Sequence, residues 1–258
     1  MAGKVVFVGA GPGDCELITI KGLKALQRAD VIFYDSLIDR GLLEGLKGEL
    51  IYVGKRRGQH SATQDEINQQ LVEHAGSNRL VVRLKGGDST VLGRLGEELL
   101  HLVENNISYE IIPGVTSATS APAFAGIPVT HRAIADSVCI VTAHRGMGGE
   151  RISIPPYNPS TTIVLMMALG TAKVWQEELV RQGYPADLPV AVISSGGTKN
   201  QKVLVTNVAQ ATQAIADSDL ATPGLAVVGK VVNLREKLEW FKGPSSDSTC
   251  QYEFYHEM

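Results

Sequence analysis

Short runs of β-branched residues alternate with segments of helical periodicity along the first part of the chain. This alternation constrains the fold more than any other feature of the sequence. Val5–Val8 and Val31–Tyr34 are such runs, and the segment Leu17–Arg28 between them has helical spacing. Strands that are bounded by glycine and separated by helices of about three turns are typical of α/β proteins with a parallel sheet. The sequence therefore predicts an α/β fold with a mainly parallel sheet in its N-terminal domain.

The pattern changes after Pro113, and we place a domain boundary there. Beyond it, the runs Val190–Ser194 and Lys202–Thr206 are joined by a short glycine-containing segment that is typical of a hairpin. Antiparallel pairing of these runs predicts a mixed sheet. We therefore expect an N-terminal α/β domain at 1–113, a C-terminal α/β domain at 114–243 and a polar tail at 244–258.

Composition and charge exclude several classes of protein. The 258 residues are 44% hydrophobic and 20% charged, which is ordinary for a folded chain. The 24 Lys and Arg against 27 Asp and Glu leave no basic excess for a general nucleic-acid surface. The longest apolar stretch, around Ile163–Leu169, is too short to cross a bilayer, and the start of the chain lacks the features of a signal peptide. The sequence thus predicts a cytoplasmic protein without a nucleic-acid or membrane partner.

Histidine and cysteine spacing gives no sign of a metal site. The three cysteines are widely separated, and the six histidines form no pair with ligand-like spacing. We therefore expect no bound metal.

Three glycine-containing turns follow predicted strands and indicate a ligand site. The turn Gly9–Asp14 lies between a strand and a helix, but Asp14 stands where the dinucleotide-binding fingerprint needs its third glycine. A carboxylate there would also repel a pyrophosphate, which argues against an NAD-dependent dehydrogenase. The second turn, Gly86–Asp88, permits close approach of the backbone and offers a carboxylate acceptor. The third turn, Pro113–Ala118, places small hydroxyl groups at a predicted helix start. Because ligands of open α/β sheets bind at the carboxyl ends of strands, the three turns predict a site for a small polar cofactor between the two domains.

Further motifs occur in a fixed order over about residues 3–241. They are Phe33–Asp35, Val53–Arg56, Gly93–Arg94, Gly96–Glu98, Pro113–Ala118, Ala125–Arg132, Pro189–Ile193 and Thr222–Gly229. Together with the glycine turns, this series resembles the tetrapyrrole methylase family, which has the class III methyltransferase fold. The resemblance implies two α/β domains with S-adenosylmethionine in the cleft between them, and a homodimer.

The resemblance also implies a reaction. The family members that this chain resembles methylate uroporphyrinogen III, a small-molecule tetrapyrrole, at C2 and C7. They form precorrin-2, which leads to siroheme and cobalamin, and release S-adenosyl-L-homocysteine. The expected activity is therefore that of an S-adenosylmethionine-dependent C-methyltransferase.

Cofactor contacts are implied by the positions that match the family. These positions are Pro12, Gly86, Gly87, Asp88, Val91, Thr116, Ser117, Met167 and Gly196, with Pro223, Gly224 and Leu225 closing the adenosine side. The residues alone favour Thr116 and Ser117 as helix caps over ligand contacts. One departure is Ser89, which replaces a proline of the family; without the ring that fixes φ, we expect weaker preorganisation of this loop.

The resemblance assigns Asp35 as proton acceptor and Lys55 as proton donor. When a pyrrole carbon gains a methyl group, positive charge builds on the ring nitrogen and its proton becomes acidic, so an ordinary carboxylate can accept it. The residues alone favour Asp35 as the cap of the following turn, and the role in proton transfer comes from the resemblance. Lys55 can either donate a proton or bind a carboxylate of the substrate.

The implied substrate carries several carboxylates, so its site should be basic. Guanidinium and ammonium groups suit carboxylates, and the candidate residues are Arg56, Arg83, Lys85, Arg94 and Arg132. Two other hypotheses remain open: a family member that acts on a later corrin or on another kind of substrate, and a non-catalytic module that binds a nucleotide or a tetrapyrrole. Retention of Asp35 and Lys55 favours an enzyme over a binding module.

Overall fold

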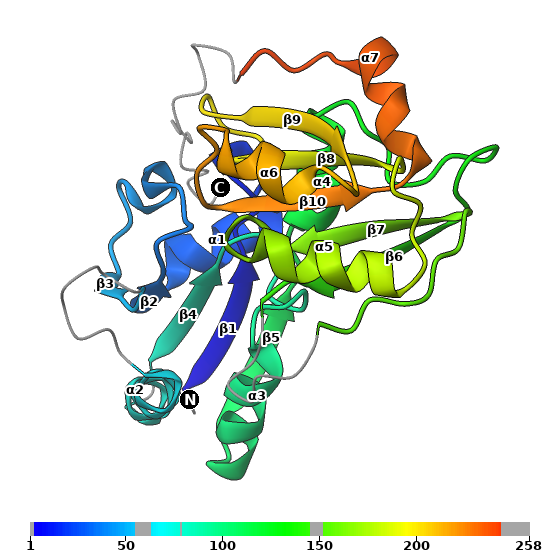
Figure 1. The fold of residues 1–258 in the computed structure, drawn as a ribbon. Helices are drawn as coiled ribbons and strands as arrows, with labels where there is room; N and C mark the ends of the chain where they lie inside the picture. The colour runs from blue at the N-terminus through cyan, green and yellow to red at the C-terminus, as the bar shows by residue number, and fades with distance from the viewer. Residues whose placement is uncertain (1–2, 55–62, 78, 145–151, 244–258) are drawn as a thin grey trace. The chain divides into compact units, whose positions relative to one another are not determined.

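The computed structural model describes residues 3–54, 63–77, 79–144 and 152–243. The predicted tail at 244–258 lies outside these ranges. The described residues form two compact units, which adjoin along the chain between Thr116 and Ser117. Each unit contains one five-stranded sheet (Figure 1).

The sheet of the first unit has the strand order β3-β2-β4-β1-β5, and every neighbouring pair is parallel. The strands are β1 Lys4–Gly9, β2 Val31–Tyr34, β3 Glu49–Tyr52, β4 Leu80–Lys85 and β5 Ser108–Ile112. The predicted parallel sheet is thereby confirmed. All carboxyl ends of these strands lie at one edge, which is where the glycine turns begin.

Helices cover both faces of this sheet. They are α1 Ile20–Arg28, α2 Gln64–Gly76 and α3 Leu95–Glu104, with the short 3-10 helices η1 Cys15–Leu17 and η2 Arg40–Leu43. Side chains alternate along β1, so Val6 packs in a core with Leu26 of α1, whereas Phe7 packs in another with Leu71 of α2 and Leu102 of α3. Burial on both faces explains why the strands read as short continuous apolar runs.

Helix α2 begins with a capping box. Thr63 Oγ1 accepts a hydrogen bond from the Glu66 backbone N–H at 3.2 Å, and Glu66 Oε2 accepts one from the Thr63 N–H at 2.6 Å. The two side chains satisfy backbone donors that a helix start would otherwise leave without partners. This start places Gln64 at the first position of the helix, and its side chain becomes part of the candidate site.

The sheet of the second unit has the order β6-β7-β10-β8-β9 and is mixed. The strands are β6 Ser137–Thr142, β7 Thr161–Met166, β8 Pro189–Ser194, β9 Lys202–Asn207 and β10 Gly224–Val228. Strands β6 and β7 are parallel, and β10 is antiparallel to both β7 and β8. Strands β8 and β9 form the predicted antiparallel pair, with Ser194 opposite Lys202.

The helices of the second unit are α4 Ser117–Phe124, η3 Leu169–Thr171, α5 Ala172–Arg181, α6 Ala211–Ala216, η4 Lys230–Leu234 and α7 Arg235–Leu238. In α5, Trp175 is fully buried and donates a hydrogen bond from Nε1 to the Ala168 carbonyl at 2.9 Å. Among the helices of the described ranges, none has the length and apolar character that crossing a bilayer requires.

Candidate functional site

Three loops of the first unit are hydrogen-bonded to one another at the carboxyl ends of β1, β4 and β5. Gly11 and Gly87 exchange backbone hydrogen bonds of 3.1 and 2.9 Å. Asp88 Oδ2 accepts a hydrogen bond from the Gly114 N–H at 2.8 Å. The sequence placed a glycine-rich turn in each of these loops separately, and the fold brings the three turns into contact.

The contact between these loops leaves no room for side chains. A Cβ on Gly9 would lie 2.6 Å from the Gly114 Cα, and a Cβ on Gly114 would lie 2.7 Å from the Gly9 Cα. Gly11 and Gly87 have φ of 76° and 66°, in the left-handed region that favours glycine. Glycine is therefore required here by close backbone approach and by backbone conformation, and the loops expose their main chain at the site.

Asp88 links its own turn to the loop after β5. Its Oδ1 accepts a hydrogen bond from the Thr90 N–H at 2.7 Å and another from the Thr90 hydroxyl. Partial burial would raise the pKa of this carboxyl, but the hydrogen bonds from Thr90 and Gly114 outweigh burial and hold the pKa below its usual value. Asp88 is therefore a carboxylate at neutral pH, and its hydrogen bonds organise the loops.

The other predicted cofactor residues of the first unit lie in the same loops. Pro12 follows Gly11, and its carbonyl accepts a hydrogen bond from the Asp14 N–H at 2.8 Å. Val91 is half-buried in the turn that follows Asp88. Thr116 is half-buried at the end of the loop after β5, directly before the helix α4. These residues remain predicted contacts, and the fold places them next to the glycine turns.

The predicted cofactor residues of the second unit lie in two places. Ser117 is the first residue of α4, and the others lie at one end of the mixed sheet. Met167 follows β7, Gly196 closely follows β8, and the antiparallel strand β10 begins at Gly224. The neighbouring Pro223 carbonyl accepts a hydrogen bond from the Ser195 N–H at 2.9 Å, and Leu225 pairs with Ile193.

Met167 and Ser195 are left-handed residues other than glycine, with φ of 59° and 50°. Such conformations cost free energy and are concentrated at ligand and active sites. The strain at the ends of β7 and β8 therefore marks this edge of the mixed sheet as a candidate for ligand contact.

Asp35 lies directly after β2 and combines two roles in the structure. Its Oδ1 accepts a hydrogen bond from the Leu37 N–H at 3.0 Å, as expected for the cap of a turn. Its Oδ2 lies 4.0 Å from Arg83 Nη2, and the side chain is 24% exposed. The carboxylate is therefore oriented by the protein and still accessible. Lys55 and Arg56, the predicted proton donor and one predicted substrate ligand, lie outside the described residues.

Arg83 and Lys85 are buried, although both were predicted to bind substrate carboxylates. Their side chains are 6% and 8% exposed, and both bind the carboxylate of Glu98, which is fully buried. Burial lowers the pKa of Lys85 more than the neighbouring Glu98 raises it. An internal ion cluster of this kind suits the positioning of other groups better than direct contact with a substrate.

Glu98 belongs to the motif Gly96–Glu98 but was assigned no role from the sequence, although it carries a recognisable signal. Leu95, Glu98 and Leu102 are spaced as the buried stripe of a helix, and all three are buried in α3. A carboxylate within an apolar stripe indicates a buried cation on a neighbouring element, because an unpaired buried charge is strongly unfavourable.

The remaining predicted substrate ligands, Arg94 and Arg132, are exposed. Arg94 binds Glu97 through Nε at 2.9 Å and through Nη2 at 2.5 Å, and the hydrogen bond to Glu97 raises the pKa of Arg94. Across the part of the chain that the structure describes, no three His, Cys, Asp or Glu side chains are grouped so that they could hold a metal ion.

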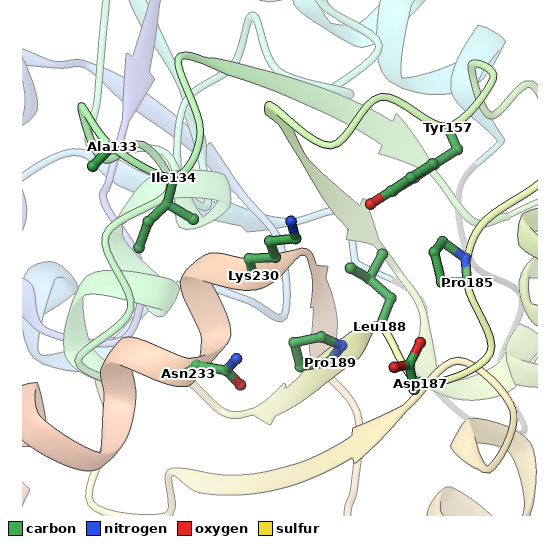
Figure 2. A pocket seen from close by; sticks show the side chains of 9 residues that line it. All are labelled: Ala133, Ile134, Tyr157, Pro185, Asp187, Leu188, Pro189, Lys230 and Asn233. Carbon is green, nitrogen blue, oxygen red and sulfur yellow. The ribbon is translucent and has the colours of Figure 1, made fainter.

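A pocket of about 500 Å³ lies within the second unit, and one of its lining residues, Ala133, directly follows the predicted substrate ligand Arg132 in the chain (Figure 2). It is found where β8 begins and β10 has ended, at the opposite end of the mixed sheet from Met167. Its lining residues are Ala133, Ile134, Tyr157, Pro185, Asp187, Leu188, Pro189, Lys230 and Asn233. None of the predicted site residues that the structure describes lines this pocket.

Comparisons with known sequences give one consistent answer. The family model described as Tetrapyrrole (Corrin/Porphyrin) Methylases matches residues 4–212. A uroporphyrinogen-III C-methyltransferase of Methanocaldococcus jannaschii is 48% identical over 238 residues, which are 91% of this chain and 98% of the relative. A siroheme synthase of Pseudomonas fluorescens is 43% identical over 247 residues, which are 95% of this chain. The chain spans 53% of that longer relative.

Solved structures agree with the sequence comparisons. The native form of a uroporphyrin III C-methyl transferase from Thermus thermophilus has a TM-score of 0.78 and 34% identity, covering 90% of this chain and 100% of that one. A Thermus thermophilus structure of this enzyme complexed with S-adenyl homocysteine has a TM-score of 0.76 and 33% identity, covering 90% of this chain and 94% of that one. These similarities extend over both units.

Proposed function

This chain belongs to the tetrapyrrole methylase family, and we propose that it methylates uroporphyrinogen III at C2 and C7, forming precorrin-2 with S-adenosylmethionine as methyl donor. The observation that carries this proposal is the 48% identity to a uroporphyrinogen-III C-methyltransferase over 98% of that relative. The three hydrogen-bonded glycine loops support it, because they offer main-chain groups to a small polar cofactor.

The glycine loops of the first unit suit a small polar molecule with hydroxyl and amine groups, and S-adenosylmethionine is such a molecule. Gly9 and Gly114 allow the loops to approach so closely that a Cβ would collide with backbone. Asp88 keeps the loops together as a carboxylate. When bound, the cofactor supplies a methyl group on a sulfonium, and its product is S-adenosyl-L-homocysteine. Pro12, Gly86, Gly87 and the other predicted contacts would hold it.

The main task of the protein is to position the reactants. Holding two reactants in line can lower a barrier by roughly 7–11 kcal/mol. Asp35 adds proton transfer, because methylation of a pyrrole carbon makes the ring N–H acidic and a nearby carboxylate can accept this proton. The Leu37 N–H and the Arg83 guanidinium orient the carboxylate of Asp35 for that role. Lys55 completes the proposed pair as proton donor or as a ligand of a substrate carboxylate.

The exposed arginines are the proposed ligands of the substrate carboxylates. Arg94 and Arg132 are exposed, and guanidinium groups bind carboxylates through two parallel hydrogen bonds. Arg94 uses Nε and Nη2 for Glu97, so its Nη1 side remains for a substrate carboxylate. Arg56 joins them as a prediction from its sequence position. Arg83 and Lys85, whose charges are bound to Glu98, act from inside the first unit instead.

We also propose that the enzyme is a cytoplasmic homodimer without a nucleic-acid or membrane partner. The family resemblance supports the dimer, and the small excess of acidic residues gives no reason to expect nucleic acid. Val138 and Ile140, on the edge strand β6, are 37% and 36% exposed and are apolar enough to lie in a subunit interface. Sedimentation equilibrium of the 27.6 kDa chain tests the dimer, and a monomeric mass refutes it.

The decisive experiment combines the purified protein, S-adenosylmethionine and uroporphyrinogen III under reducing conditions and determines the mass of the product. Addition of two methyl groups supports the proposed function. Addition of one group points to a methylase with another natural substrate. Tight binding of S-adenosyl-L-homocysteine without any transfer points to a binding module.

A further inference from the structure

A cluster of buried charges lies at the carboxyl end of β4. Glu98 of α3 is fully buried, and Arg83 and Lys85 of β4 are also buried. Taking charged groups out of water costs several kcal/mol for each ion, and apolar side chains of similar volume often stabilise a fold as well or better. The cluster therefore calls for an explanation other than packing.

Glu98 binds both cations at once. Its Oε1 accepts a hydrogen bond from Arg83 Nε at 3.2 Å, and its Oε2 accepts one from Lys85 Nζ at 2.6 Å. Gln64, at the start of α2, donates from Nε2 to Oε1 at 3.2 Å. A single carboxylate thereby joins β4, α2 and α3 through their side chains.

Lys85 connects this cluster to the glycine turns. Side chains alternate along a strand, so residues 81, 83 and 85 share the face of β4 on which Val81 packs in the core with α2 and α3. The Lys85 carbonyl accepts a hydrogen bond from the Ala10 N–H at 2.8 Å, and the turn Gly86–Asp88 follows directly. Anchoring the Lys85 side chain therefore determines where this turn starts.

Arg83 connects the cluster to the proposed proton acceptor. Its Nη2 lies 4.0 Å from Asp35 Oδ2, and its Nη1 donates to the Leu84 carbonyl at 3.1 Å. Because Nε is bound to Glu98, all three nitrogens of the planar guanidinium have neighbours that define its orientation. The two cations and two carboxylates also balance one another in charge.

We propose that Glu98 is a positioning residue for methyl transfer, a role that rests on the proposed function. Through Lys85 it sets the start of the turn Gly86–Asp88, and through Arg83 it orients the carboxylate of Asp35. Glu98 acts through these residues and does not touch the substrate. Because a misplacement of about 1 Å can lower a rate roughly 100-fold, loss of this anchor should appear in kcat.

The test compares Glu98→Gln with the matched control Glu104→Gln. Glu104 lies on the same helix and is exposed, and its carboxylate has no hydrogen bond or ion pair within the described residues. Calorimetric titration with S-adenosyl-L-homocysteine counts the binding sites per chain, so that kcat is expressed per folded site. We expect Glu98→Gln to lower kcat per site at least about tenfold, with the KM for uroporphyrinogen III changed less than about threefold. Glu104→Gln should match the wild type.

A purely structural role for Glu98 gives another result. The melting temperature and the number of sites then fall, but kcat per remaining site equals the wild-type value, and this outcome overturns the proposal. If Glu98→Gln does not fold, Glu98→Asp replaces it, because it keeps the buried charge and shortens the side chain by one methylene. A folded Glu98→Asp enzyme should also lose kcat per site, and wild-type kcat per site overturns the proposal again.

Failure of the proposed function is recognised separately. It appears as absence of methyl transfer by the wild type, whereas failure of the positioning role appears as an active wild type with variants of equal kcat per site.

Discussion

Gly114→Ala should separate the loops after β1 and β4 from the loop after β5 and thereby weaken cofactor binding. The new Cβ would collide with the carbonyl oxygen of Gly87 and would lie 2.7 Å from the Cα of Gly9, whereas ordinary contact begins at 3.4 Å, so the backbone must move by at least 3.4 − 2.7 = 0.7 Å. Overpacking of this kind costs about 1–3 kcal/mol. Displacement of the Gly114 N–H from the Asp88 carboxylate removes a charge-assisted hydrogen bond worth about 1.5–3 kcal/mol. Since about 1.4 kcal/mol is a tenfold change, we expect the Kd for S-adenosyl-L-homocysteine to rise at least about tenfold.

The assay is calorimetric titration with S-adenosyl-L-homocysteine, and Gly96→Ala is the control. A Cβ on Gly96 meets nothing within 4 Å, and the residue lies in the helix α3, where alanine is favoured over glycine by up to about 1 kcal/mol. The control should therefore bind like the wild type and be slightly more stable in urea. A folded Gly114→Ala protein with the wild-type Kd would refute the argument that close backbone approach builds the site.

Three further predictions concern proton transfer, a buried hydroxyl and acid stability. Asp35→Ala should lower kcat at least about tenfold while leaving the affinity for S-adenosyl-L-homocysteine within about twofold, and an unchanged kcat would remove Asp35 from the mechanism. Thr162→Val should raise the free energy of unfolding in urea by about 1 kcal/mol, because the Thr162 hydroxyl is fully buried and has no hydrogen-bond partner among the described residues; a loss of stability would contradict this. Hydrogen bonds from Lys21 and Lys4 lower the pKa of Glu110 from 4.5 to about 2, so its contribution is present above about pH 4.5 and is lost as the pH falls through about 2. The free energy of unfolding of the wild type should exceed that of Glu110→Gln by at most about 1 kcal/mol, because the ion pairs of Glu110 with Lys21 and Lys4 are partly exposed. This difference should vanish below about pH 2, and a difference that grows on acidification would refute the lowered pKa of Glu110.

The sequence alone determined the type of fold and the kind of chemistry. The alternation of strand-like runs with helical segments was sufficient to predict the parallel sheet. Burial on both faces makes each strand of such a sheet a short continuous apolar run, which the sequence displays. Asp14 argued against a dinucleotide through its charge and through its position in the turn after the first strand. These inferences depend on neighbours in the chain, which a sequence displays directly.

The tertiary structure decided which charges face the solvent and which face one another. Arg83, Lys85 and Arg94 are all basic residues near glycine turns, and the sequence gives no reason to treat them differently. In the fold, Arg94 is exposed, whereas the first two are buried against Glu98, which follows them by 15 and 13 residues in the chain. This pairing depends on how α3 packs against β4, and the contact of Asp88 with Gly114 depends on where β5 joins the sheet. Such contacts follow from the packing of whole elements, and therefore only the folded chain reveals them.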